Sequence, residues 1–94
     1  MSDPVEITVY SRENCHLCAS AMETIDRVVD DTDVAVAVEE IDVDADAQLA
    51  ETYGDRVPHV VINDEDAFSY RVHAAELRTK LQAAANTVGT EPTE

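Results

Sequence analysis

Two cysteines, Cys15 and Cys18, are the residues whose type and spacing point most directly to chemistry. Only His16 and Leu17 separate them, and the chain has no other cysteine. A disulfide between residues so close in sequence closes a very small loop and constrains the unfolded chain little. If the two sulfurs bond to each other, we therefore expect the bond to serve a reaction and not the stability of the fold.

The residues around the cysteines predict a strand, a short polar loop and the start of a helix. Residues 5–10 alternate apolar and polar side chains and are rich in β-branched residues, as strands are, and Asn14 is a suitable N-cap. From Leu17 onward, apolar residues recur at spacings of three and four, which predicts a helix that ends near 30–33. Unpaired N–H groups at a helix start favour an anion, so they would lower the pKa of the Cys15 thiol from its ordinary ~8.5.

Cys18 lies one helical turn beyond Cys15, on the apolar side of the predicted helix. This asymmetry suits an exposed attacking thiolate at Cys15 and a shielded resolving thiol at Cys18, which closes the disulfide and expels the product. A protonated His16 beside Cys15 would stabilise the thiolate further and would make the couple more oxidising.

Metal binding is an alternative use of the same residues. A C-x-x-C pair supplies half of the four ligands that structural zinc needs, and the chain has no second such pair. An iron–sulfur cluster would require a second copy of the chain or an outside thiol. A metal or iron–sulfur delivery module that uses Cys15, Cys18 and His16 stays open as a second hypothesis, and two thiols without chemistry as a third.

Val57 and Pro58 form the second informative pair. Proline cannot donate a hydrogen bond to a sheet, so Pro58 marks the start of a strand over residues 59–62. A cis peptide bond between the two would present the Val57 backbone to an extended substrate. Such main-chain pairing suits an enzyme whose substrates share little beyond a cysteine.

The pattern of apolar and polar residues along the whole chain predicts a single α/β domain with the element order β-α-β-α-β-β-α. The turn at 63–66 is too short for a crossover, so the strands on either side of it are antiparallel, whereas helices connect the earlier strands. This order predicts one four-stranded mixed sheet with helices on both faces. The expected elements are at 5–10, 17–30, 34–43, 44–53, 59–62, 67–70 and 74–85.

Two further expectations concern the ends of elements. Gly54 is expected to end the short fourth element in a left-handed conformation. Residues 1–94 are expected to form one domain with a core over about 5–85, and residues 86–94 a flexible tail.

The charge balance is strongly acidic, with 21 acids against 6 bases and a net charge of −15. Clear apolar periodicity argues against disorder, so we interpret the acidity as a surface of the kind found in halophilic microbes. In molar salt the Debye length is only ~3 Å, and dense carboxylates repel one another little. Such a surface repels phosphates and anionic lipids, so we expect neither nucleic acid nor membrane as a partner. The first residues predict no signal peptide or membrane span, and we expect a cytoplasmic protein.

With these motifs in this order, the chain resembles the glutaredoxin-like proteins of the thioredoxin superfamily, over about residues 5–84. The resemblance lies in S-R-E-N-C-H-L-C at 11–18, I-D-V-D-A-D at 41–46 and Y-G-D-R-V-P at 53–58, followed by the hairpin and the last helix. It implies a thioredoxin/glutaredoxin-like fold with Cys15 as nucleophile, Cys18 as resolving thiol and Pro58 as a cis-proline beside them. The implied activity is that of a thiol–disulfide oxidoreductase that requires no metal or prosthetic group.

The expected partners follow from that activity. Substrates would be protein or small-molecule disulfides, and the reductant an outside reductase or thiol, either glutathione or another low-molecular-weight thiol. Val57, Pro58, Arg12 and Arg56 are the residues that we expect to contact substrate, the arginines because they offer charge to an anionic thiol. We expect the protein to act as a monomer.

Overall fold

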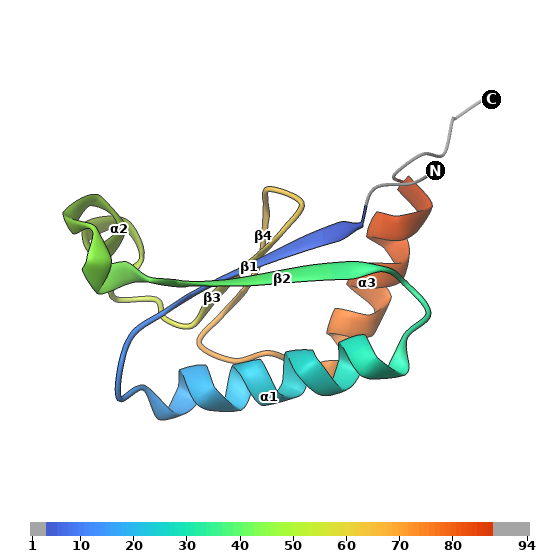
Figure 1. Cartoon of the computed structure of the whole chain (residues 1–94), viewed down its shortest axis with the longest axis horizontal. Coiled ribbons are helices and arrows are strands. Elements are labelled where there is room, and N and C mark those ends of the chain that lie inside the picture. The colour runs from blue at the N-terminus through green and yellow to red at the C-terminus, as the bar shows by residue number, and fades with distance from the viewer. Residues whose placement is uncertain (1–3, 88–94) are drawn as a thin grey trace.

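The arrangement of helices and strands confirms the predicted order, with one additional short 3₁₀ helix, η1 (Figure 1). A computed structural model describes residues 4–87 of the chain. The elements are β1 (Val5–Ser11), α1 (His16–Asp31), β2 (Val36–Asp42), η1 (Val43–Ala45), α2 (Ala47–Tyr53), β3 (His59–Ile62), β4 (Glu65–Ser69) and α3 (Ala74–Thr87).

The four strands form one mixed sheet in the order β2-β1-β3-β4. β1 and β2 are parallel, because α1 connects them, while β3 is antiparallel to both β1 and β4. The β3–β4 turn contains Asn63 and Asp64 at φ of 49° and 71°, the left-handed values that tight hairpins require. The predicted mixed sheet is therefore confirmed.

The hydrophobic core lies between one face of the sheet and the helices α1 and α3. Alternate residues of β1 point into it, since Val5, Ile7 and Val9 are each at most 1% exposed. They meet buried residues at helical spacing: Ile25 and Val28 of α1, Leu77 and Leu81 of α3. This packing fixes the start of α1 at the end of the sheet where β1 finishes.

The opposite face of the sheet is covered by α2 at one end only. Tyr53 of α2 stacks on Tyr10 of β1 and on His59 of β3, both of which alternate with core residues. In Figure 1, α2 lies at the same end of the sheet as the first turn of α1. Helices therefore flank both faces, as predicted.

β2 is an edge strand, so one of its sides has no neighbouring strand among residues 4–87. Residues 37–40 are all exposed, including Val38 at 37%. Glu39, Glu40 and Asp42 give this edge a dense negative charge.

Three local predictions are wrong. The fourth strand was expected at 67–70, after a turn at 63–66, but β4 already begins at Glu65 and ends at Ser69. Cys15, and not Asn14, is the N-cap of α1, and Asn14 precedes it at a left-handed φ of 60°. Gly54 does end α2, but in the right-handed region at φ −56°. Its lack of a side chain serves close packing instead, because a Cβ there would collide with the carbonyl oxygen of Ala50.

The last helix is slightly longer than predicted, since α3 continues to Thr87. The rest of the predicted tail, residues 88–94, lies outside the described residues. In the described part of the chain, no helix has the length and apolarity needed to cross a bilayer.

Candidate functional site

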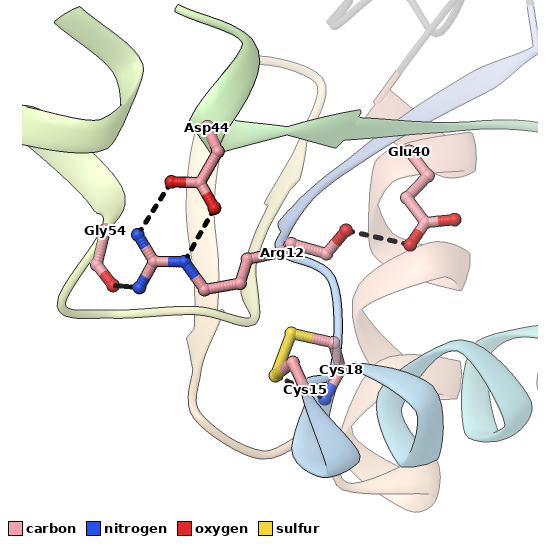
Figure 2. The surroundings of a disulfide bond; sticks show 7 residues. Arg12, Cys15, Cys18, Glu40, Asp44 and Gly54 are labelled. Atoms are coloured by element: carbon pink, nitrogen blue, oxygen red, sulfur yellow. Dashed lines mark hydrogen bonds and ion pairs between the residues drawn. A yellow bond between two sulfur atoms is a disulfide. The ribbon is translucent and has the colours of Figure 1, made fainter. Parts of the chain in front are cut away.

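Cys15 and Cys18 are joined by a disulfide at the first turn of α1, with their Cα atoms 5.2 Å apart (Figure 2). The backbone N–H of Cys18 donates a hydrogen bond to Sγ of Cys15 at 3.1 Å, which is the usual task of an N-cap side chain. Cys18 is buried, at 3% exposure, whereas Cys15 is partly exposed. Of the two bonded cysteines, Cys15 is thus the one that solvent reaches.

The first turn of α1 differs in charge from the chain as a whole. Although 21 residues are acidic, none lies in the first turn of the described helix α1. His16, the first residue of the helix, is exposed. The positive end of the helix therefore faces Cys15 without a competing carboxylate on that turn.

Val57 and Pro58 lie at the same end of the sheet as the cysteines. Tyr10 pairs with His59, so Pro58 lies beside the end of β1, where the loop to Cys15 begins. The Val57–Pro58 peptide bond is cis, as the resemblance implies. Pro58 is fully buried, and its carbonyl accepts a hydrogen bond from the N–H of Tyr70 at 2.8 Å.

The backbone of Val57 itself is unpaired. Among residues 4–87, neither its N–H nor its C=O has a hydrogen-bond partner. Val57 is only partly buried. One backbone donor and one acceptor at Val57 are thus left without a partner in the described part of the chain.

The two predicted arginines differ in their surroundings. Arg12 donates from Nε and Nη2 to the carboxylate of Asp44, at 3.1 and 3.0 Å, and from Nη1 to the carbonyl of Gly54 at 3.1 Å (Figure 2). The hydrogen bond with Arg12 lowers the pKa of Asp44, and the same bond raises the pKa of Arg12. Arg56 is exposed, and its side chain has no partner in the part of the chain that the structure describes. A substrate contact stays a prediction for both, but the Arg12 guanidinium is already bound within the chain.

A stack of three rings lies behind the Val57–Pro58 segment. The Tyr10 and Tyr53 ring centroids are 4.1 Å apart, and those of Tyr53 and His59 are 5.1 Å apart. Burial, followed by the neighbouring Tyr53, raises the pKa of Tyr10. The stack lies at the end of β1, which leads into the loop to Cys15, and at the start of β3, which follows Val57 and Pro58.

The His59 side chain is held from two further directions. It is 3% exposed as a residue, with Nδ1 at 2.8 Å from Ser69 Oγ and Nε2 at 3.0 Å from an Asp66 carboxylate oxygen. The carboxylate can only accept, so Nε2–H donates to Asp66. The site residues inferred from the sequence did not include His59, because the partners of its ring depend on strand register.

The buried hydroxyl of Ser11 was also absent from the site residues inferred from the sequence. Ser11, the last residue of β1, is 4% exposed and donates from Oγ to Glu40 Oε2 at 2.8 Å. Figure 2 shows Glu40 among the residues around the disulfide. No sequence signal pairs the two, since they lie 29 residues apart on neighbouring strands.

A pocket of about 370 Å³ lies between the first turns of α1 and the segment before α3. Leu17 and Tyr70, which are 44% and 50% exposed, are among its lining residues, together with Arg71 and His73. Leu17 stands between the two cysteines, so the pocket adjoins the disulfide. Within residues 4–87, no three or more histidine, cysteine, aspartate or glutamate side chains are grouped so as to hold a metal ion.

The model of the glutaredoxin-like domain (DUF836) matches residues 6–82 of this chain. The chain belongs to the glutaredoxin-like family. The matched residues run from β1 into α3 and include both cysteines and the Val57–Pro58 pair. A search of curated proteins found no match.

Solved structures agree with this assignment. The X-ray structure of target protein XcR50 from X. campestris is 32% identical, covers 82% of this glutaredoxin-like chain and 96% of its own, and has a TM-score of 0.68. Protein Ne2328 from Nitrosomonas europaea is 25% identical, with coverages of 86% and 95% and a TM-score of 0.71. Chloroplastic thioredoxin z is 20% identical, with coverages of 86% and 78% and a TM-score of 0.70, which shows a shared fold alone. The predicted thioredoxin-like fold is confirmed.

Proposed function

We propose that this glutaredoxin-like protein is a thiol–disulfide oxidoreductase, with Cys15 as its nucleophile and Cys18 as its resolving thiol. The observation that carries the proposal is the disulfide itself, which joins a partly exposed N-cap sulfur to a buried one. Family membership supports a redox role for such a pair.

In the first step, the Cys15 thiolate attacks one sulfur of a substrate disulfide. The substrate S–S bond breaks, a mixed disulfide forms at Cys15, and the second substrate sulfur leaves as a thiolate that takes a proton from water. The Cys18 N–H, which bonds Cys15 Sγ at 3.1 Å, and the acid-free first turn of α1 favour the attacking anion. A protonated His16 adds a positive charge at the same turn.

In the second step, Cys18 loses its proton and attacks Cys15 Sγ. The mixed disulfide breaks, the remaining substrate thiol is released, and the Cys15–Cys18 disulfide forms. Two electrons have then passed from the protein dithiol to the substrate. An outside reductase or a low-molecular-weight thiol, glutathione or another, returns the protein to its reduced state.

The unpaired backbone of Val57 supports docking of an extended substrate beside Cys15. Two main-chain hydrogen bonds there would hold the segment that carries the disulfide without reading its side chains. The exposed Arg56, one residue earlier, would attract acidic groups on that segment.

Trapping of the mixed disulfide tests the proposal. Reduced Cys18→Ser protein is mixed with a short disulfide-bonded peptide, and intact mass is measured after an alkylating quench. We expect a stable adduct on Cys15 that a dithiol reverses, whereas Cys15→Ser, the matched control, gives none at equal time. Absence of an adduct in Cys18→Ser, or equal adducts in both variants, would refute the assignment of Cys15.

A further inference from the structure

One side chain, Arg12, ties the loop that leads into Cys15 to both ends of the segment that leads into Pro58. Its guanidinium bonds Asp44 in η1, before α2, and the carbonyl of Gly54, after α2. Residues 44 and 54 are thereby held to one planar group (Figure 2). A bidentate pair of this kind fixes orientation as well as distance.

The α2 segment has few other attachments. None of the residues of α2 is buried. Its Tyr53 joins the ring stack, and the carbonyl of Asp55 accepts a hydrogen bond from the Tyr70 hydroxyl at 3.0 Å. The position of residues 55–57 therefore depends on a small number of contacts. Arg12 makes one of them directly, to the Gly54 carbonyl, and its two bonds to Asp44 hold the other end of α2.

Gly54 makes room for this arrangement. A Cβ at this position would lie 3.3 Å from Arg12 Nη2, closer than most Cβ contacts. The guanidinium and the end of α2 thus pack directly against each other. Val57 follows Gly54 by three residues, so displacement of Gly54 moves the backbone that is available to substrate.

Because of the same contacts, the Arg12 charge is not available to a substrate. Asp44 balances it, and Nε, Nη1 and Nη2 each already donate to the chain. Small anionic disulfides, which depend on charge, find no free guanidinium at this residue. An extended polypeptide, which depends on backbone pairing, finds the backbone of Val57 held in place.

We propose that Arg12 is a positioning residue that aligns the Val57 backbone for extended polypeptide disulfides, which are the substrate class of this site. This inference rests on the proposed function. It assigns to Arg12 an effect on polypeptide binding through Gly54, and no contact with the reacting sulfurs.

The test compares two substrates that carry no net charge, a disulfide-bonded peptide of about ten residues and 2-hydroxyethyl disulfide. Steady-state kinetics are measured for wild type, Arg12→Gln and Asp44→Asn with a dithiol as reductant. The matched control is Arg78→Gln, which breaks a second Arg–Asp pair, Arg78 to Asp31 at 3.2 Å, between α3 and α1. Circular dichroism checks that every variant is folded.

We expect Arg12→Gln to raise the ratio of the peptide KM to the small-disulfide KM about tenfold, the value of one or two hydrogen bonds lost to substrate. Asp44→Asn should raise the same ratio less, because the bond to Gly54 remains. A double variant, Arg12→Gln with Asp44→Asn, should exceed Arg12→Gln by little, since loss of the Arg12 guanidinium already removes its bonds to Asp44. Arg78→Gln should leave the ratio unchanged.

An unchanged ratio in Arg12→Gln overturns the inference, and so does an equal loss with both substrates, which is the mark of general destabilisation. A ratio that rises equally in Arg78→Gln also overturns it. These outcomes differ from failure of the proposed function, in which the wild-type protein reduces neither substrate.

Discussion

Replacement of His59 by phenylalanine and by alanine separates the two kinds of contact that hold the start of β3. Phenylalanine keeps a ring against Tyr53 but loses the bonds to Ser69 and Asp66. Each such bond contributes about 1 kcal/mol, so His59→Phe should cost about 1–2 kcal/mol. Alanine also loses the stack and leaves a cavity in place of a side chain that is 4% exposed, so we expect a cost of about 3–4 kcal/mol.

Urea unfolding of the oxidised protein, followed by circular dichroism at constant salt, measures both values. The controls are Ser69→Ala and Asp66→Ala, which keep the ring and remove one bond each, and each should cost less than His59→Phe. The reasoning is refuted if His59→Phe is as stable as wild type, or if the alanine variant costs no more than the phenylalanine variant.

Three further predictions concern packing and titration. Gly54→Ala should lower the free energy of unfolding by about 1–3 kcal/mol, seen in the same urea experiment, because its Cβ meets the Ala50 carbonyl oxygen; equal stability would contradict this. The lowered pKa of Asp44 means that its pair with Arg12 stabilises the fold above the ordinary value of about 3.9 and is lost as the pH falls through the lower folded value. Asp44→Asn should therefore reduce the loss of unfolding free energy at acid pH. A dependence on pH identical to that of wild type would contradict a stabilising pair between Asp44 and Arg12. The raised pKa of Tyr10 means that stability falls as the pH rises from about 10 towards the higher folded value. Absorbance at about 295 nm should show a late-ionising phenol that Tyr10→Phe removes, and titration of all tyrosines together would disprove it.

Local pattern was sufficient for the framework of the fold. The alternation at residues 5–10 and the recurrence of apolar residues after Leu17 correspond to β1 and α1, because a strand or helix with one buried face repeats with its own period. Pro58 located the second half of the site for an equally local reason, since it cannot donate within a sheet.

Contacts between distant residues were not predictable in this way. Arg12 meets Asp44 across 32 positions, and the sequence offered no reason to pair them instead of leaving Arg12 for substrate. Asn14 is the better N-cap by residue type, yet the sulfur of Cys15 takes that role because the disulfide fixes it at the helix start. Gly54 was expected for its backbone freedom and is needed for its small volume.

The open side of β2 gives the acidity of the chain a second consequence. An edge strand offers unpaired N–H and C=O groups to any other strand, and this is how aggregates grow by addition of one molecule to the next. Here a second molecule would have to bring its own carboxylates alongside Glu39, Glu40 and Asp42, against a charge of −15 on each copy. The same carboxylates thus also keep the sheet from being extended by its neighbours, most strongly when salt is low.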